Sequence, residues 1–263
     1  MPHARWAAAL RAVAAPSAAA MKRSLSSAPP PHHASPVRLD RHGDFAVITL
    51  CNPSKRNALS LGVLEALSAA FRDASSRCQC ASARTLTPNT SASDARGIVL
   101  AAEGPVFSAG HNFGEMAGTS REAAHHLFSA CASLMQAITS APQPVIARVH
   151  ALATAAGCQL VASCDLAVAA RSAAFALPGG HGGLFCHTPL VAVARTVSPK
   201  RAMEMALTGD RIPAAQALEW GLVNRVVDDE ELERFENASA ASGVDVACGR
   251  GCSSFALRLQ GHV

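Results

Sequence analysis

Hydrophobic and polar positions follow the period of a strand first and the period of a helix next. Residues 37–50, VRLDRHGDFAVITL, alternate on either side of a turn at Gly43 and predict a β-hairpin. From Ser60 to Ala74 the apolar residues recur at helical spacing behind a serine that can cap the first turn. Regular structure therefore begins with a hairpin followed by a helix.

Strands and helices then alternate along the chain. We expect strands at 97–102, 144–149, 165–170 and 222–227, and helices at 121–139, 156–163, 188–197, 199–209 and 213–221. Gly209 and Gly221 stand where helices end in the left-handed conformation. This alternation predicts an α/β fold in which right-handed crossovers build a largely parallel sheet.

Two segments lack this order. Residues 75–94 are small and polar without periodicity, which indicates an insertion in a compact domain. Residues 231–263 mix glycines and small residues without a sustained period, so we expect an atypical, disordered tail. The ordered domain is thus predicted to span 37–230.

The N-terminal segment, 1–36, contains no acidic residue but four of the basic ones, and it is rich in alanine and serine. This composition is typical of a mitochondrial transit peptide that directs a protein to the matrix. A disordered Ala/Pro-rich tail is the alternative. Arg11 and Pro16 interrupt the apolar run, so no membrane span is expected here.

The formal net charge of +4 comes largely from this N-terminal segment, and the rest of the chain is close to neutral. Nucleic-acid binding normally needs a basic face or a recognisable motif, and neither is found in the sequence. Cys78 and Cys80 form a close pair, but no partner ligand lies nearby, so no metal site is predicted.

Three short segments carry the candidate chemistry: NPSKRNALS at 52–60, GPVFSAGHN at 104–112, and ATAAGCQLVASCD at 153–165 followed by FALPGGHGGLF at 175–185. In order and spacing they resemble the crotonase, or enoyl-CoA hydratase/isomerase, superfamily over about residues 37–227. The resemblance implies a crotonase-like (ββα)n spiral core. It also implies a coenzyme A thioester as the ligand, with no other cofactor.

The resemblance further implies an oxyanion hole built from two backbone N–H groups. One belongs to His111 in SAGH and the other to Ala156 in TAAG. Small residues let the thioester approach the main chain, and the helix N-terminus adds positive potential where charge develops on oxygen. Two tight turns that only pack helix on sheet are the alternative.

Segment 54–58 matches the family region that receives the adenine end of coenzyme A. The candidate coenzyme A contacts are Ser54, Lys55, Arg56, Ala58 and Gly110. Lys55 and Arg56 can pair with phosphates, although isolated basic residues of this kind are also common as solvated surface charges.

The chain departs from the family at its acids. Family hydratases use two glutamates to position water and move its proton, and the matching positions here are Gln159 and Gly179. Neither residue can accept a proton, so we expect thioester binding without hydration, and no certain catalytic residue. Restoring both glutamates should then raise hydration.

Other functions stay open. An active acyl-CoA isomerase or thioesterase could use the oxyanion hole with His187, which falls near a carboxylate position of some family isomerases, although a solvent-facing histidine is the simpler interpretation. His181 and Glu115 are weaker candidates. A regulatory protein that binds no ligand is a third hypothesis.

The family normally ends in helices that cover the acyl site and support homotrimers. Here the matching pattern stops near Glu236, so the C-terminal helical region is predicted to be truncated or altered. We therefore expect a chain that does not assemble as the family does, or that is poorly soluble.

Overall fold

The computed structural model describes residues 35–43, 45–75, 95–237, 244–246 and 257–259. All of them belong to one unit, Ser35–Val263. The predicted transit segment, except for Ser35 and Pro36, and the predicted insertion, except for Ser75, lie outside the described residues.

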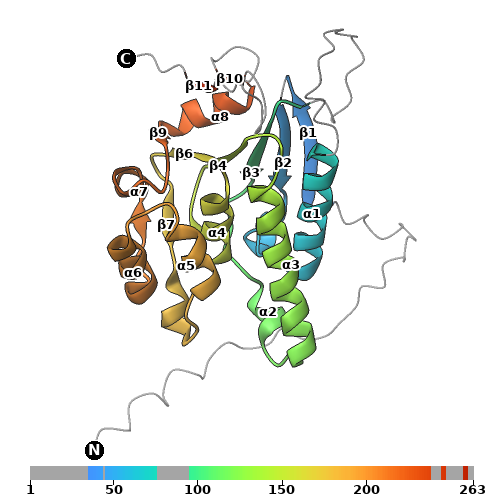
Figure 1. Cartoon of the computed structure of the whole chain (residues 1–263), viewed down its shortest axis with the longest axis vertical. Helices are drawn as coiled ribbons and strands as arrows, with labels where there is room; N and C mark the ends of the chain where they lie inside the picture. Colours follow the sequence, from blue (N-terminus) through green and yellow to red (C-terminus); the bar gives the residue numbers. More distant parts are fainter. Residues whose placement is uncertain (1–34, 44, 76–94, 238–243, 247–256, 260–263) are drawn as a thin grey trace, which may run out of the picture. The chain divides into compact units, whose positions relative to one another are not determined.

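A six-stranded sheet in the order β1-β2-β3-β4-β6-β9 forms the centre of this unit (Figure 1). Its strands are β1 Val37–His42, β2 Phe45–Leu50, β3 Gly97–Ala102, β4 Val145–Val149, β6 Leu166–Ala170 and β9 Arg225–Val227. Only the β1–β2 pair is antiparallel, with His42 opposite Phe45 in the predicted hairpin. The other pairs are parallel, as the alternating pattern predicts.

Helices lie between the strands and after the last strand of the central sheet, and the longer ones bury apolar side chains in the core. They are α1 Leu61–Ser75, α2 Phe113–Met116, α3 Arg121–Thr139, α4 Ala156–Ser163, α5 His187–Val193, α6 Pro199–Thr208, α7 Ala214–Trp220 and α8 Asp229–Asn237. Ser60 caps α1 as predicted, since its hydroxyl accepts the Val63 N–H at 3.3 Å. Gly209 and Gly221 end α6 and α7 in the left-handed conformation.

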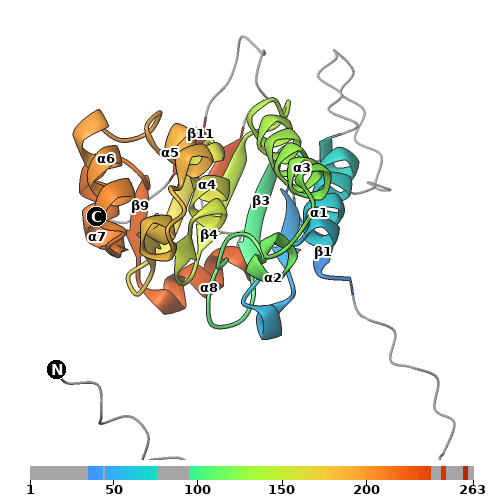
Figure 2. The same ribbon diagram turned by 90° about the horizontal axis from the view of Figure 1, so that it is seen from below.

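Figure 2 shows α1, α3 and α4 on one face of the central sheet and α8 on the other. Arg148 of β4 reaches α8 and donates to the Leu232 carbonyl at 3.3 Å. β2 and β3 are buried along their whole length, and because successive side chains of a strand point to opposite faces, both faces of these strands are covered. The apolar core therefore extends through both sides of the sheet.

A second sheet, of three strands, was not predicted from the sequence. Its order is β5-β7-β8, with β5 Ala153–Thr154, β7 Ala174–Ala176 and β8 Ile212–Pro213. Strands of two or three residues are too short to show alternation. They matter because β5 leads directly into α4, and β7 is followed by the 3-10 helix η3 Pro178–Gly182.

The structure differs from the expectation for the C-terminal tail. α8 continues through Asn237, and β10 Val244–Val246 pairs with β11 Leu257–Leu259. Asp229, Glu230 and Glu231 occupy the first turn of α8, where acidic residues stabilise a helix. The remaining tail residues lie outside the described part of the chain.

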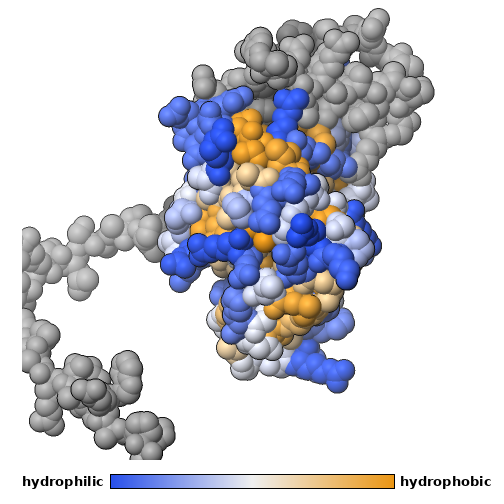
Figure 3. Space-filling view, turned by 90° about the vertical axis from the view of Figure 1, so that its left-hand side faces the viewer, coloured by the Kyte–Doolittle hydropathy of each residue, from blue (hydrophilic) through white to orange (hydrophobic). Residues whose placement is uncertain are grey.

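Large apolar side chains are also exposed on the α5–α7 side of the unit. They include Val191, Met203, Leu207 and Leu218, and Leu207 is 67% exposed. Figure 3 shows this side, where apolar areas alternate with polar ones. The predicted failure to assemble is not tested by a single chain and stays a prediction. In the described part of the chain, no helix has both the length and the apolarity that a membrane crossing requires.

Candidate functional site

Three loops meet at the carboxyl-terminal edge of the central sheet. Segments 51–59, 103–112 and 150–155 follow β2, β3 and β4, and those neighbouring strands are parallel. Parallel strands bring their carboxyl ends to one edge, where ligands of open α/β sheets usually bind. The predicted segments are thereby brought together.

Asn57 joins the first two loops. Its side chain is fully buried; Oδ1 accepts the Asn52 N–H at 2.9 Å, and Nδ2 donates to the carbonyls of Glu103 at 2.8 Å and Val106 at 3.0 Å. Its positive φ of 49° is a conformation that asparagine tolerates better than most residues. Sequence analysis missed this role, although asparagine before a helix is a known turn signal.

Ser108 joins all three loops and was also missed. Its buried hydroxyl donates to the Asn57 carbonyl at 2.8 Å and accepts the Gly110 N–H at 3.2 Å. Its own carbonyl accepts the Thr154 N–H at 2.9 Å. Gly157 must be a glycine here, because a Cβ would lie 2.6 Å from the Ser108 carbonyl oxygen.

The N–H of His111 is directed away from this network. Leu59 donates to the Gly110 carbonyl at 2.8 Å and accepts the Asn112 N–H at 3.4 Å. The parallel bridge between Leu59 and His111 is therefore made by the neighbours of His111 and not by its own backbone groups. Such a parallel bridge leaves the N–H of the opposite residue on the other side. Among the described residues, no acceptor pairs with the His111 N–H.

The N–H of Ala156 lies beside the same loop. Ala156 begins α4, where an N–H has no partner within the helix, and none of the described residues outside α4 accepts it either. Gly110, at φ 82°, is pressed against this turn, since a Cβ on it would lie 3.2 Å from the Ala156 nitrogen. The two predicted donors are thus carried by adjoining main-chain segments.

Ala155 holds the turn in a strained conformation. Its φ of 49° and ψ of −120° are unusual for a residue with a Cβ, and its N–H donates to the Ala176 carbonyl at 2.9 Å. The bond continues the β5–β7 pairing into the start of α4. The small second sheet therefore sets the position of the α4 N-terminus.

The His111 ring is mostly buried against α3. It meets the Phe128 ring edge-on, with centroids 5.3 Å apart, and its Nδ1 lies 3.4 Å from the Leu59 carbonyl. Burial lowers the pKa of His111, so the ring is neutral at pH 7. Its buried Nε2 has no hydrogen-bond partner among the described residues.

Gln159 lies one turn into α4, whose eight residues are all buried. The side chain is 7% exposed, and its Oε1 is buried without a partner among the residues that the structure describes. An amide oxygen accepts hydrogen bonds and takes up no proton at neutral pH. At this position the chain keeps a polar side chain but not a base.

Gly179 lies in η3, where no space for a side chain remains. A Cβ would stand 2.0 Å from the Leu184 carbonyl oxygen and 2.6 Å from the Cys186 Sγ. Leu184 donates its N–H to the Gly179 carbonyl at 2.9 Å, and the Gly179 N–H donates to Cys186 Sγ at 3.3 Å. This closed turn argues against the expectation that a glutamate at 179 would restore hydration.

The thiols near these positions are not nucleophiles. Cys158 is fully buried, and burial raises its pKa to about 12. Burial also raises the pKa of Cys186. Both therefore remain protonated thiols at neutral pH.

The remaining predicted residues lie nearer the surface. Ser54, Lys55 and Arg56 are exposed on and just after the 3-10 helix η1, Pro53–Lys55, while Ala58 is half-buried and Gly110 is buried. His187 is exposed at the start of α5, with Nδ1 3.5 Å from the Phe185 carbonyl.

His181 and Glu115 are already engaged. His181 Nε2 lies 2.8 Å from the Thr208 carbonyl. Glu115 accepts the Leu61 N–H at 2.9 Å and the Asn112 amide at 3.1 Å, and so caps the start of α1. These contacts give both residues structural roles.

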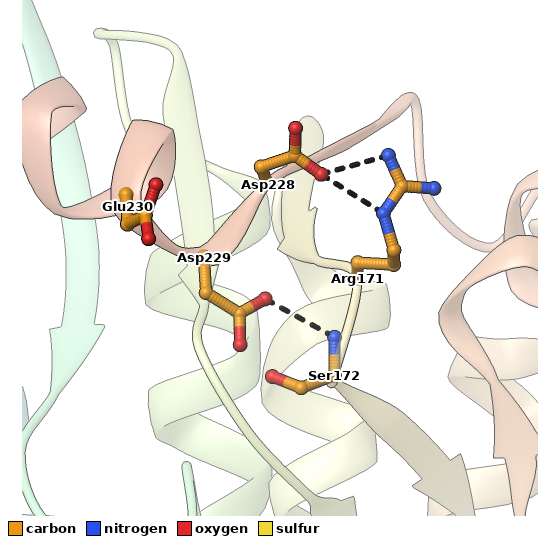
Figure 4. A pocket seen from close by; sticks show the side chains of 5 residues that line it. All are labelled: Arg171, Ser172, Asp228, Asp229 and Glu230. Atoms are coloured by element: carbon orange, nitrogen blue, oxygen red, sulfur yellow. Dashed lines mark hydrogen bonds and ion pairs between the residues drawn. The ribbon is translucent and has the colours of Figure 1, made fainter.

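A separate open pocket of about 470 Å³ is lined by Arg171, Ser172, Asp228, Asp229 and Glu230 (Figure 4). Arg171 pairs with Asp228 at 2.8 Å, and the Ser172 N–H donates to Asp229 at 3.2 Å. Hydrogen bonds from Ser172 lower the pKa of Asp229. These contacts tie the start of α8 to the turn after β6. In the described ranges no group of three or more His, Cys, Asp or Glu side chains could hold a metal ion.

Comparison with known proteins supports the predicted family. The family described as enoyl-CoA hydratase/isomerase matches residues 40–242. The protein named enoyl-CoA hydratase domain-containing protein 3, mitochondrial, is 44% identical to the chain over 187 residues in Rattus norvegicus and 46% identical over 188 residues in Homo sapiens. Each alignment covers 71% of this chain and 57% of the relative, so the match spans little more than half the length of these relatives.

Solved structures show the same fold. The human enoyl Coenzyme A hydratase domain-containing protein 3 superposes with a TM-score of 0.69 at 42% identity, covering 76% of this chain and 74% of that one. An enoyl-CoA hydratase from Mycobacterium smegmatis also gives 0.69, at 45% identity, with 77% and 74% covered. The crotonase-like fold is thereby confirmed, and the chain belongs to the enoyl-CoA hydratase/isomerase family.

Proposed function

We propose that this protein binds acyl-CoA thioesters at the carboxyl-terminal edge of its central sheet and does not hydrate enoyl thioesters. The observation that carries the proposal is the contact of the Gly110 main chain with the α4 N-terminus, next to the N–H groups of His111 and Ala156, for which the described residues provide no acceptor. Two such donors would hold a thioester oxygen. The family supports this ligand class.

The surroundings suit that oxygen. Ala156 and Gly157 begin α4, so the helix adds partial positive charge at the point where the oxygen would lie. Asn57 and Ser108 lock the loop of His111 in place, so the donors need little rearrangement when a ligand arrives. Preorganised backbone donors of this kind contribute more than flexible ones.

The absence of hydration rests on Gln159 and Gly179. General acid–base groups typically contribute about 10²–10⁴-fold each, and neither residue can transfer a proton. The Leu184 carbonyl also fills the space that a side chain at 179 would need. We therefore expect crotonyl-CoA to bind without turnover at a typical hydratase rate.

The coenzyme A portion would extend toward the segment 54–58. Lys55 and Arg56 are exposed there and provide two positive charges for phosphates. Ala58 and Gly110 line the inner end of this path with small residues. The acyl portion would continue past Ala156 toward Gln159.

One pair of glycine variants tests the binding site. Gly110 and Gly118 both have positive φ, 82° and 71°, but a Cβ at 118 meets no atom within 4 Å. Gly110→Ala should lower butyryl-CoA affinity at least about tenfold by displacing the α4 turn, which corresponds to the loss of at least one good hydrogen bond. Gly118→Ala introduces the same kind of backbone strain without a steric contact, and it should leave butyryl-CoA affinity unchanged.

Calorimetry with butyryl-CoA, crotonyl-CoA and free coenzyme A measures these affinities, and loss of enoyl absorbance measures hydration. A circular dichroism melt checks that both variants fold. If the unaltered protein binds none of the thioesters, the proposed function is wrong. Turnover of crotonyl-CoA at a typical enzyme rate would instead contradict the loss of hydratase chemistry.

We further propose that the protein acts in fatty-acid metabolism in the mitochondrial matrix. The acid-free basic segment 1–36 and the word mitochondrial in the names of the relatives support this location. Residues 1–36 fused to a fluorescent protein should be imported into the matrix. A fusion that stays cytosolic would rule out this segment as the targeting signal.

A further inference from the structure

The turn after η3 holds large apolar side chains in solvent. Leu184 and Phe185 are 47% and 42% exposed, and Val191 of the following helix α5 is 55% exposed. Hydrogen bonds fix the backbone of this turn. The Leu184 N–H donates to the Gly179 carbonyl at 2.9 Å, and the His187 N–H donates to the Phe185 carbonyl at 2.8 Å. The apolar side chains are therefore exposed by a closed turn rather than by a loosely packed one.

This turn also has open space around its main chain. A Cβ added at Gly180, Gly182 or Gly183 would meet no atom within 4 Å. In Figure 1 the ribbon that joins β7 to α5 lies at the end of the unit away from α8. Apolar side chains that gather on an exposed surface usually mark a place of contact with a partner or a membrane.

The charge of the segment around the turn has one sign. Residues 166–203 contain four Lys or Arg residues and no Asp or Glu. Two of the four, Arg171 and Arg201, pair with carboxylates outside this range. The other two, Arg195 and Lys200, are exposed, and among the described residues no carboxylate pairs with either. Their positive charges are thus available to an anionic partner.

These positive charges border the apolar side chains. Arg195 follows Val191 by one helical turn, because Ala194 keeps helical backbone angles and donates to the Leu190 carbonyl at 2.8 Å. Residues four apart on a helix share a face. Lys200 lies in the first turn of α6, which packs against both η3 and α5. Apolar and cationic side chains therefore lie on neighbouring elements of one surface.

We propose that the surface formed by Leu184, Phe185, Val191, Arg195 and Lys200 binds to membranes that contain anionic phospholipids. Aromatic and aliphatic side chains enter the boundary between headgroups and acyl chains, and basic side chains near it are attracted to the negative headgroups. No carboxylate of the segment 166–203 opposes this attraction. The inference goes beyond the proposed function and does not depend on thioester binding, so the two can fail separately.

Co-sedimentation with vesicles of phosphatidylcholine, alone or mixed with phosphatidylglycerol, tests the inference on the full chain. The chain should bind the mixed vesicles much more strongly than the neutral ones, and added salt should weaken binding by screening the charges. Phe185→Ser should lower binding to mixed vesicles about tenfold, because it removes an apolar ring from the contact. Lys200→Gln should lower it about fivefold, the effect of one basic residue near an anionic surface.

Leu218→Ser is the matched control. Leu218 is also 42% exposed but lies on α7, away from the turn after η3 in Figure 1, so its loss should leave vesicle binding unchanged. Tryptophan variants report which side chain enters the membrane. The emission of Phe185→Trp should shift to shorter wavelength on mixed vesicles, and that of Leu218→Trp should not.

Three results would overturn the inference. The first is that the unaltered chain does not bind mixed vesicles. The second is that binding persists in Phe185→Ser, which would assign it to another part of the chain such as the basic segment 1–36. The third is that light scattering shows assemblies of the chain that Phe185→Ser separates, because this surface would then be a contact between copies.

Discussion

Gln159 and Gly179 stand at the two positions where the sequence resemblance predicts glutamates in the family's hydratases, and their surroundings in the structure differ. At 159 a buried polar side chain remains, with an oxygen that no described residue satisfies. At 179 the chain has closed, with the Leu184 carbonyl and the Cys186 thiol in the place of a side chain. Position 159 holds a buried amide that is not a base, and position 179 has no space for a side chain.

The difference shows that two substitutions of the same kind in sequence need not be equally reversible. Gln159→Glu exchanges an amide NH₂ for an oxygen within an existing volume. A glutamate at 179 must first displace the turn that Leu184 N–H closes on the Gly179 carbonyl at 2.9 Å. A glutamate at 179 therefore needs a rearranged main chain as well as a new side chain, and the following experiments test the two positions in turn.

The largest loss of stability is expected when the hydrogen bonds that hold the loop of Asn57 beside the α4 N-terminus are removed. Asn57→Ala removes three hydrogen bonds to buried backbone groups of Asn52, Glu103 and Val106. We expect a loss of about 3 kcal/mol or more in the free energy of unfolding, since each unpaired buried group costs about 1–3 kcal/mol. Urea denaturation measures it. Ser54→Ala, an exposed change in the same loop, should stay within about 0.5 kcal/mol; equal losses would refute the role of Asn57.

Adding a single methyl group at position 179 tests whether this turn has space for a side chain. Gly179→Ala places a Cβ 2.0 Å from a backbone oxygen, while Gly180→Ala meets no atom within 4 Å. Overpacking of this kind should cost about 1–3 kcal/mol at 179. The neighbouring variant should be nearly neutral, and thermal unfolding compares the two. If Gly179→Ala proves as stable as Gly180→Ala, the position is open after all.

Gly179→Glu combined with Gln159→Glu extends this test to function. Steric displacement of Leu184 should lower stability before any hydration appears. Gln159→Glu alone should fold normally and still fail to hydrate crotonyl-CoA at an enzymatic rate. A stable double variant with clear hydration, measured by loss of enoyl absorbance, would show that the turn rearranges at little cost.

The main chain at the start of α4 is tightly packed against the loop of Ser108, and a second pair of glycine variants tests this packing. A Cβ on Gly157 of α4 would meet the Ser108 carbonyl at 2.6 Å, whereas Gly62 of α1 has free space. Gly157→Ala should therefore lose about 1 kcal/mol or more. Gly62→Ala should gain about 0.5–1 kcal/mol from helix propensity. If urea denaturation shows that both variants are more stable than the unaltered protein, α4 can shift away from Ser108.

The smallest effect is expected from the insertion. Gln143, fully buried, donates to the carbonyls of Ala74 at 3.2 Å and Ala95 at 3.4 Å, and so holds the two ends of segment 76–94 together. Replacing 76–94 by a short Gly/Ser linker should change unfolding free energy by about 1 kcal/mol or less, the scale of loop-closure entropy. Butyryl-CoA affinity should stay constant. A large loss of unfolding free energy or of butyryl-CoA affinity would show that segment 76–94 contributes to the fold or to the site.

Sequence patterns predicted the long elements closely. The β1–β2 hairpin, α1 and α3 show clear periods, and β3 is a continuous apolar run; the predicted bounds of all four agree with the structure within about one residue. β5, β7 and β8 were missed because two or three residues cannot display a period.

At the site, motif resemblance located the loops but not the bonds between them. The roles of Asn57 and Ser108 depend on carbonyls 46 to 51 residues away, and no local pattern encodes such pairings. The closure at Gly179 depends on where the Leu184 backbone folds back, which the glycine alone does not reveal. Long-range backbone contacts are thus what sequence analysis could not supply.

The adjoining N–H groups of His111 and Ala156 belong to the main chain, which every residue except proline carries. A point mutation at either codon alters a side chain but leaves the donor itself in place, provided that the turn keeps its path. Selection on chemistry acts on side chains such as Gln159, whereas the main-chain part of the pocket is inherited with the fold. A lineage can therefore abandon one reaction and keep its ligand, which turns an enzyme scaffold into a starting point for a carrier or a sensor.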